Sequence, residues 1–167
     1  MTLIKNSIVI FLSTIFLISC TEQKDMEYTE DRGFEVNERS YQLGMLSGFG
    51  EFVKGGIKPL SVSTSFSSSD MDIIYPDLEI VAKRLGIKVY RETSPMETDL
   101  FPFSRDEIVI FYMGDVLDQY LAVKARKQAL LDNDQYVGEA RRQIAYDFGK
   151  LMGYSDEGIE QFLSSSE

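Results

Sequence analysis

Residues 107–113 read Glu-Ile-Val-Ile-Phe-Tyr-Met, and this stretch decides the fold. A strand that is covered on one face alternates apolar and polar residues, whereas a strand covered on both faces is apolar throughout. From Ile108 to Met113 the only polar group in a side chain is the hydroxyl of Tyr112. The run therefore predicts a central, buried strand of a sheet.

Two further segments have the pattern of strands. Between residues 60 and 67, every second position is a serine and the positions between them are apolar or threonine. This period of two predicts a half-buried strand. Residues 87–91 follow a glycine and place Ile87 and Val89 on one face, which predicts another strand. Together the three segments predict a small sheet.

Residues 36–54 have the spacing of a helix that stops at Gly55. Apolar side chains recur every four residues, at Tyr41, Met45, Phe49 and Val53. Gly44, Gly48 and Gly50 weaken this helix, and the G-x-x-x-G spacing of Gly44 and Gly48 would indicate helix dimerisation inside a membrane. Because charged residues flank the pair, we expect a close helix or sheet contact inside a soluble core instead.

The middle of the chain predicts a turn, a helix and a loop. Residues 67–70 are Ser-Ser-Ser-Asp and should turn, and Pro76 is suited to be the first residue of a helix that runs to Leu85 and stops at Gly86. Residues 92–105 contain two prolines and should form a loop. The apolar residues in that loop are expected to dock on the body of the domain, and they are Leu100, Phe101 and Phe103.

The last third of the chain is predicted to be helical. One helix spans 115–131, a second is capped by Asp134 and runs to Met152, and a third is capped by Ser155 and runs to Leu163. The side chains expected to point inward from the three helices are Val116, Tyr120, Leu121 and Leu130, then Val137, Ala140, Ile144, Phe148 and Leu151, then Ile159, Phe162 and Leu163. The order of elements predicts an α+β fold, with a sheet of about three strands covered by four to five helices.

The first twenty residues have the layout of a secretory signal. Lys5 is the only charge before residue 20, the segment 7–19 is almost entirely apolar or small, and charged residues follow Cys20 closely. A helix that spans a bilayer needs about 20 apolar residues, and this run is shorter. A short N-terminal transmembrane anchor with an incidental cysteine is the alternative.

The residues 17–20, Leu-Ile-Ser-Cys, resemble the lipobox of bacterial lipoproteins. Ser19 stands where that family normally has glycine or alanine, and Ile18 is bulkier than usual. The resemblance covers residues 1–20 and implies that the Cys20 thiol carries diacylglycerol, that a peptidase cuts before Cys20, and that the new amino terminus is acylated. It divides the chain into a signal peptide at 1–19, a lipidated cysteine with a flexible polar tether at 20–35, and a single α+β domain at 36–167.

The resemblance also implies a location at the bacterial cell membrane, exported and held by lipid, with membrane lipid as the partner of acylated Cys20. In enterobacteria-like systems an aspartate after the cysteine favours the inner membrane. Thr21 lacks that signal, which favours an outer membrane, facing the periplasm, in an organism that has one.

The composition excludes several kinds of chemistry. The chain has one cysteine and no histidine, so a lipidated Cys20 would leave no thiol and no imidazole for disulfides, histidine-dependent catalysis or the usual zinc sites. The formal charge is −10, and cleavage before Cys20 would remove Lys5 and leave about −11. Such a domain should repel nucleic acid and attract a basic protein or peptide, although acidity also serves solubility.

Two acidic segments are candidate sites. Asp70 and Asp72, with Asp77 and Glu79 nearby, could bind a cation or hold paired carboxylates for acid–base chemistry, but turn and helix-start chemistry explains them without a ligand. The segment 132–134, Asp-Asn-Asp, begins like a calcium loop. Its continuation lacks the glycine and the further oxygen ligands of that loop, so a turn between helices is expected.

The basic and aromatic residues give a third set of candidates. Five basic residues on the predicted helices could face an anionic ligand together, and solvated helix faces are the ordinary explanation for Lys124, Arg126, Lys127, Arg141 and Arg142. Five tyrosines are expected in the core or at its rim, namely Tyr41, Tyr75, Tyr90, Tyr112 and Tyr120. The sequence assigns no catalytic residue, no metal ligand set and no cofactor.

The leading functional hypothesis is a membrane-anchored accessory or partner-binding lipoprotein of the cell envelope that is not an enzyme. One version is an immunity or inhibitor lipoprotein that blocks a basic toxin or enzyme through its acidic surface. The first alternative is a small envelope hydrolase that uses carboxylates. The second is a solute-binding module, which would need a sizeable pocket.

Overall fold

A computed structural model describes residues 37–102 and 106–164. The predicted signal peptide, Cys20, the predicted tether and Phe103 lie outside these ranges. Within the described ranges, no helix is long and apolar enough to cross a membrane.

Most of the apolar segment 107–113 forms the central strand of the sheet. β3 (Ile108–Tyr112) lies between β1 (Leu60–Val62) and β2 (Lys88–Glu92), and it pairs antiparallel with both. The register places Tyr112 opposite Leu60 on one side and opposite Lys88 on the other. An isolated bridge between Phe66 and Glu107 extends the pairing beyond β1. The predicted central, buried strand is confirmed.

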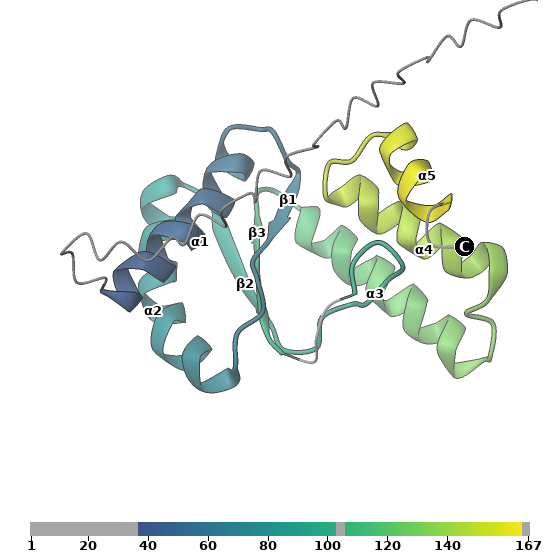
Figure 1. Cartoon of the computed structure of the whole chain (residues 1–167), viewed down its shortest axis with the longest axis horizontal. Helices are drawn as coiled ribbons and strands as arrows, with labels where there is room; N and C mark the ends of the chain where they lie inside the picture. Colours follow the sequence, from purple (N-terminus) through teal and green to yellow (C-terminus); the bar gives the residue numbers. More distant parts are fainter. Residues whose placement is uncertain (1–36, 103–105, 165–167) are drawn as a thin grey trace, which may run out of the picture. The chain divides into compact units, whose positions relative to one another are not determined.

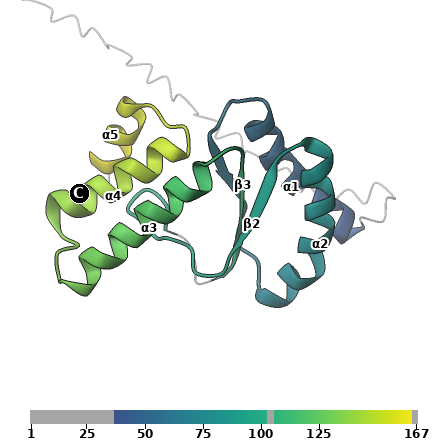
Figure 2. The same cartoon turned by 180° about the vertical axis from the view of Figure 1, so that it is seen from behind.

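Five helices in the described residues cover this sheet, and they are α1 (Glu38–Lys54), α2 (Ser68–Leu85), α3 (Val116–Asp132), α4 (Gly138–Leu151) and α5 (Asp156–Ser164). Figures 1 and 2 show α1 and α2 on one face of the sheet and α3, α4 and α5 on the other. The side chains of β3 alternate accordingly, because Val109 and Phe111 join the core on the α1–α2 side while Ile108 and Ile110 join the core on the other side. The α+β fold expected from the sequence is confirmed.

The strand expected at 60–67 ends at Val62, and its first residues are more buried than predicted, whereas Thr64, Ser65 and Ser67 beyond it are exposed. Leu60, Ser61, Val62 and Ser63 are all buried, because helices cover both faces of the sheet. The serines are accommodated by hydrogen bonds as well as by small size. The Ser63 hydroxyl donates to the Thr64 carbonyl at 2.6 Å and accepts from the Val109 amide at 2.9 Å.

The start of α2 also differs from the prediction. The helix begins at Ser68, inside the expected turn, and Pro76 lies within it rather than at its first position. Ser67 caps the helix by accepting a hydrogen bond from the Asp70 amide at 3.2 Å. The buried stripe of apolar side chains continues on both sides of the proline, through Met71, Ile74, Leu78 and Ala82. Proline removes one helical donor, and this packing holds the helix together despite that loss.

The start of α4 corrects another prediction. Asp134 does not cap this helix, which begins at Gly138, because Asp134 has a positive φ of 55° and belongs to the turn after α3. Val137, expected to point inward, is 66% exposed as the residue before the helix. Leu121 on α3 and Phe162 on α5 are also exposed rather than buried. All three were assigned to the core from helical spacing, and they lie at the margins of the contacting faces.

The other predicted helix ends are confirmed. Gly86 ends α2 with a left-handed φ of 75°, and Gly153 follows α4 with a φ of 82°. Ser155 caps α5, since its hydroxyl accepts a hydrogen bond from the Gly158 amide at 3.1 Å. Ile159 and Leu163 then point into the core, as expected.

The loop between β2 and β3 docks on the helices, as expected for Leu100 and Phe101. The Phe101 ring packs edge-on against Phe148 of α4 with 5.0 Å between ring centroids. Thr98 and Phe101 exchange two backbone hydrogen bonds of 3.1 Å, which closes the loop into a tight turn. The described part of the loop is therefore held against α3 and α4.

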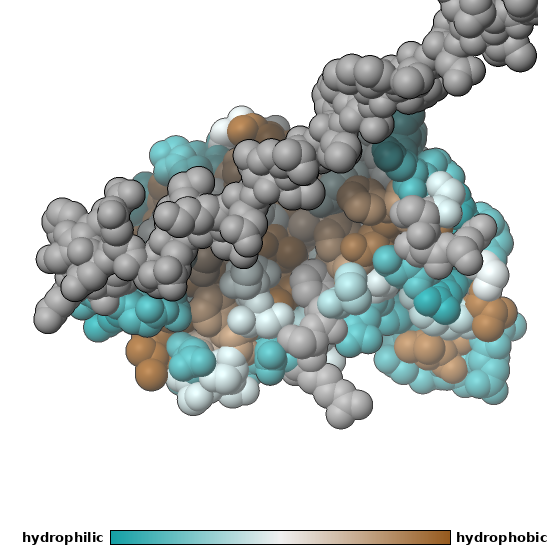
Figure 3. All heavy atoms as spheres, in the orientation of Figure 1, coloured by the Kyte–Doolittle hydropathy of each residue, from teal (hydrophilic) through white to brown (hydrophobic). Residues whose placement is uncertain are grey.

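In Figure 3, hydrophilic residues dominate much of the visible surface and apolar residues gather toward the middle of that face.

Candidate functional site

The acidic residues of α2 do not converge on a site. The Asp70 carboxylate accepts from the Ser67 hydroxyl at 2.7 Å, Asp72 pairs with Arg91 at 2.6 Å, and Asp77 pairs with Arg39 of α1. Glu79 is exposed on the same helix. Within residues 37–102 and 106–164, no three Asp, Glu, Cys or His side chains gather as metal ligands would. The predicted cation site at Asp70 and Asp72 is therefore not assembled by the described residues.

Asp72 belongs instead to a structural cluster around Arg91. The Arg91 guanidinium donates to Glu107 at 2.5 Å and to Asp72 at 2.6 Å, and it approaches the Ser68 carbonyl at 3.3 Å. The Ser68 hydroxyl donates to the second Glu107 oxygen at 2.6 Å. Hydrogen bonds from Arg91 and Ser68 hold the pKa of Glu107 below its ordinary value. The cluster connects the start of α2 to β2 and to the residue before β3.

A buried carboxylate that the sequence did not single out lies at the end of β2. Glu92 is 2% exposed and accepts from Lys124 at 2.8 Å, from the Ser94 amide at 2.8 Å and from the Tyr120 hydroxyl at 3.1 Å. Burial raises the pKa of Tyr120, and the negative charge of Glu92 adds to the effect. Among the described residues, no buried side-chain nitrogen or oxygen lacks a hydrogen-bond partner. We interpret this network as structural, because its donors and acceptors satisfy one another.

The basic residues predicted to face an anion together are mostly neutralised separately. Lys124 pairs with Glu92, Arg126 with Asp147, Arg141 with Asp99, and Arg142 with Glu160. Lys127 is the exception among the five. Its ammonium donates to the backbone carbonyl of Glu97 at 2.6 Å and lies 5.2 Å from the centroid of the Tyr136 ring. The structure brings Lys127 and Arg141 to one cleft and pairs the other three elsewhere.

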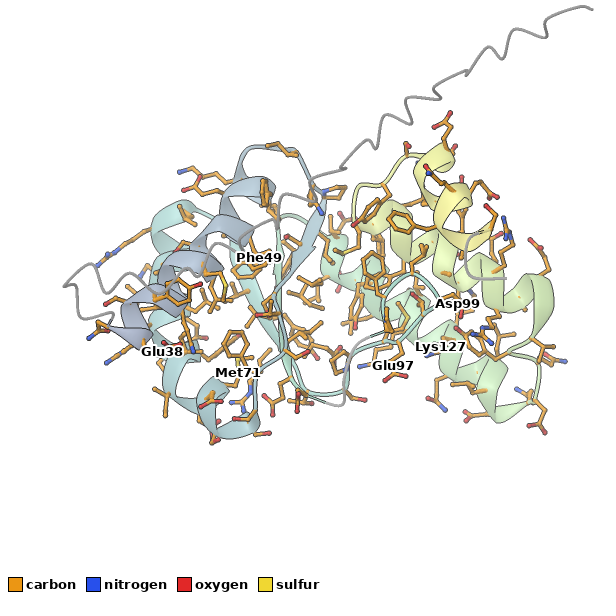
Figure 4. All side chains as sticks on the ribbon, viewed as in Figure 1. Glu38, Phe49, Met71, Glu97, Asp99 and Lys127 are labelled. Carbon is orange, nitrogen blue, oxygen red and sulfur yellow. The ribbon has the colours of Figure 1, made fainter. Side chains whose placement is uncertain are left out.

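That cleft is the best candidate site in the described residues, with a volume of about 360 Å³. The residues around it come from the loop between β2 and β3, from α3, from the turn before α4 and from α4 itself. Figure 4 shows Glu97, Asp99 and Lys127 close together where the loop meets α3. The side chains that line the cleft are Glu97, Thr98, Asp99 and Pro102 from the loop, Lys127 from α3, and Tyr136 and Arg141 from the segment that follows.

The electrostatics of the cleft differ from one cation to the other. Arg141 contacts both oxygens of Asp99, at 3.0 and 2.9 Å from its Nε, and these hydrogen bonds raise its pKa. The pKa of Lys127 is lowered, mainly because the ammonium is partly withdrawn from water, and the nearby carboxylates only offset this effect in part. Burial raises the pKa of Tyr136, and the charge of Asp99 adds to it. The carboxylates near Lys127 therefore do not fully offset the cost of partly burying its positive charge.

The remaining candidates have local roles. Asp132 ends α3, Asn133 and Asp134 lie in the expected turn between α3 and α4, and the Asn133 side chain donates to the Ala129 carbonyl at 2.7 Å. Tyr120 lies in the core, and Tyr75, Tyr90 and Tyr112 lie at its rim, also as expected. Tyr41 is the exception, since it is 60% exposed on α1.

Gly44 and Gly48 on α1 face open space among the described residues. The prediction that this pair makes a close helix or sheet contact in the core is therefore wrong. Among the described residues, no heavy atom outside the immediate helix lies within 4 Å of a Cβ added at Gly44 or Gly48. Gly50 is the glycine of this helix that packs closely, since an added Cβ would lie 2.8 Å from Ile87 Cδ1. The helical repeat places the exposed Tyr41, Met45 and Phe52 on the same side as the first two glycines.

Comparison with known proteins identifies no relative of this chain. No family model matches the chain, and neither a curated protein nor a solved structure matches it. The functional argument below therefore uses the residues of this chain alone.

Proposed function

We propose that this protein is an exported bacterial lipoprotein of the cell envelope that acts by binding a partner rather than by catalysis. The lipobox-like residues 17–20 and the polar segment after them support the lipid anchor and the tether. The observation that carries the binding role is the pairing of charges in the described residues. The carboxylates proposed for catalysis hydrogen-bond to arginine or serine side chains, or lie exposed on α2, and do not converge on a common cleft.

The partner expected for such a surface is a basic protein or peptide. The chain has a formal charge of −10, and exposed carboxylates lie on helices at both faces of the sheet, among them Glu51 of α1, Glu79 of α2 and Glu139 of α4. A negative field accelerates the encounter with a positive partner and repels nucleic acid. An immunity or inhibitor lipoprotein that covers a basic toxin or enzyme is the specific version of this proposal.

The test is capture of a partner by the purified mature chain in low and in high salt. We expect a basic envelope protein to be retained at low ionic strength and released at high ionic strength, because salt screens the attraction between exposed charges. A variant with Glu51→Gln, Glu79→Gln and Glu139→Gln should retain less of it. Failure to retain any basic protein at low salt would contradict the proposal.

The solute-binding alternative has one observation in its favour, the cleft of about 360 Å³ beside Lys127. Its volume falls in the range of small-molecule sites, although its lining is more polar than most. The hydrolase alternative needs two carboxylates within catalytic reach of one substrate bond. The described carboxylates of α2 do not provide that arrangement.

A further inference from the structure

The cleft beside Lys127 contains two opposite charges that satisfy each other. Arg141 and Asp99 form a multiple hydrogen-bonded ion pair across its rim. Each of these two side chains already has its counter-ion, so neither of them leaves a charge for a ligand to neutralise.

The other two charges in the cleft have no such partner. The Glu97 carboxylate and the Lys127 ammonium form no ion pair with any side chain in the described part of the molecule, although the Glu97 carbonyl accepts from Lys127. The Tyr136 hydroxyl likewise has no hydrogen bond to another described residue. An ammonium that interacts with the Glu97 charge and with the Tyr136 ring but forms no ion pair, a carboxylate and a phenol thus line one small volume.

These groups specify the chemistry of a ligand. The ammonium of Lys127 is partly buried and under-compensated, so a carboxylate beside it would restore the interactions that burial removes. Tyr136 keeps its proton at neutral pH and can donate to the same carboxylate. Glu97 can accept from an ammonium group. A phosphate dianion fits less well, because Glu97 and Asp99 would both repel it.

We propose that this cleft binds a small zwitterion, a free amino acid or a short peptide, with its carboxylate at Lys127 and Tyr136 and its ammonium at Glu97. The volume of about 360 Å³ accommodates a molecule of that size. The tight turn between Thr98 and Phe101 fixes the loop wall in advance, which lowers the entropy cost of binding. The residues that line this cleft are different from Glu51, Glu79 and Glu139, which were proposed to face a protein partner.

Titration calorimetry on the purified chain tests the proposal with defined probes. The probes are L-alanine, L-phenylalanine and the dipeptide Ala-Ala, each compared with its N-acetylated form and its C-terminal amide. We expect saturable binding of the free forms and at least a tenfold loss of affinity when either charged end is capped. The comparison of amino acids with the dipeptide shows which of the two sources the cleft prefers.

Variants locate the site. Lys127→Met and Glu97→Gln should each weaken binding at least tenfold, because each removes one charged hydrogen-bonding group. The matched control is Lys150→Met, since Lys150 pairs with Asp156 outside the cleft and its loss should leave affinity unchanged. Circular dichroism of each variant confirms folding.

Three results would overturn the proposal. They are the absence of saturable binding by every free zwitterion, equal binding of free and capped probes, and unchanged affinity in folded Lys127→Met. Failure here leaves the salt-dependent capture of a protein partner unaffected, because that test involves a different surface.

Discussion

At the residue scale, the network around Glu92 explains how the loop before β3 is attached to α3. A carboxylate that is 2% exposed is costly to bury unless it is paired and hydrogen-bonded, and Glu92 has both kinds of partner. Tyr120 also accepts from the Met96 amide at 3.3 Å, so the same hydroxyl connects the helix to the loop. The loop that forms the wall of the cleft is therefore positioned by a buried charge.

Replacing Glu92 by glutamine should destabilise the protein strongly. The glutamine amide removes the negative charge that faces Lys124. Its NH₂ group also cannot accept the hydrogen bonds that Ser94, Tyr120 and Lys124 donate to the carboxylate. We therefore expect a loss of about 2–4 kcal/mol in the free energy of unfolding. Urea denaturation measures it. Lys150→Met, which removes a solvent-exposed ion pair, is the control and should cost less than about 1 kcal/mol. A loss below about 0.5 kcal/mol in Glu92→Gln would refute the network.

Glu107 should contribute a pH dependence of stability. Its pKa is lower in the folded protein than in the unfolded chain, so the unfolded chain binds more protons in acid. Its stabilising contribution is present above the ordinary glutamate pKa of about 4.3 and is lost as pH falls through the lower folded value.

The measurement is urea unfolding of wild type and Glu107→Gln between pH 7 and pH 3. Near neutral pH the wild type should be more stable than Glu107→Gln, and the difference in their free energies of unfolding should shrink as the pH falls. A difference that stays constant across this range would show that Arg91 and Ser68 do not hold the carboxylate in its charged form.

Some single-residue features were predictable and others were not. Ser155 and Gly86 act through contacts within a few residues, so the sequence identifies them as helix ends. Glu92 and Lys124 are 32 positions apart and meet only when the sheet packs on α3. Their sequence context looks like an ordinary strand end and an ordinary helix, although Tyr120 and Lys124 do share one helical face with spacing of four.

At the element scale, α1 carries two glycines that the folded domain does not require. Glycine in a helix interior is less favourable than alanine by about 0.5–1 kcal/mol. Gly44→Ala and Gly48→Ala should each raise the free energy of unfolding by about that amount, because an added Cβ meets open space. Thermal and urea denaturation of the single variants measure the gain.

Gly50→Ala is the matched control on the same helix. An added Cβ would lie 2.8 Å from Ile87 Cδ1 and 3.1 Å from Leu85 Cδ1, so those side chains must shift and this variant should gain less stability than Gly44→Ala or Gly48→Ala. Equal effects of alanine at all three positions would contradict the packing described for α1.

The start of α2 provides a direct test of a corrected prediction. Ser67→Ala removes the side chain that caps the Asp70 amide and should cost about 1 kcal/mol. Urea unfolding of this variant measures the effect, and Ser40→Ala, at an exposed serine in the first turn of α1, is the control. A helix that began at Pro76 would make Ser67→Ala neutral.

The error at α2 has a physical cause. Proline is favoured at the first turn of a helix and disfavoured in its interior, and that local preference predicted a start at Pro76. The buried face of α2 spans residues on both sides of the proline, so tertiary packing outweighs the loss of one hydrogen bond. The prediction for β3 succeeded because a strand that is apolar on both faces has to be covered on both faces, which places it in the middle of the sheet.

At the scale of the whole molecule, the covered sheet separates the charged surface into two helical faces. The acidic residues predicted as a site on α2 do not meet the basic residues predicted as a site on α3 and α4. Most residues of both sets instead form ion pairs with residues far away in the sequence. The sequence therefore predicted the fold class and the charge of the protein, while the cleft required tertiary geometry. Lys127 and Arg141 were among the basic candidates, but Glu97, Asp99 and Tyr136 carried no signal that distinguished them from loop and turn residues.

The central claim is that the chain is processed before Cys20 and held to a membrane by lipid on that cysteine. Mass spectrometry of the N-terminal peptide, on protein expressed in bacteria and recovered from membranes, tests it directly. We expect a peptide that begins at Cys20 with fatty acyl groups on its thiol and amino terminus, and Cys20→Ser should abolish palmitate labelling. A chain that retains residues 1–19 and a free Cys20 thiol would contradict it.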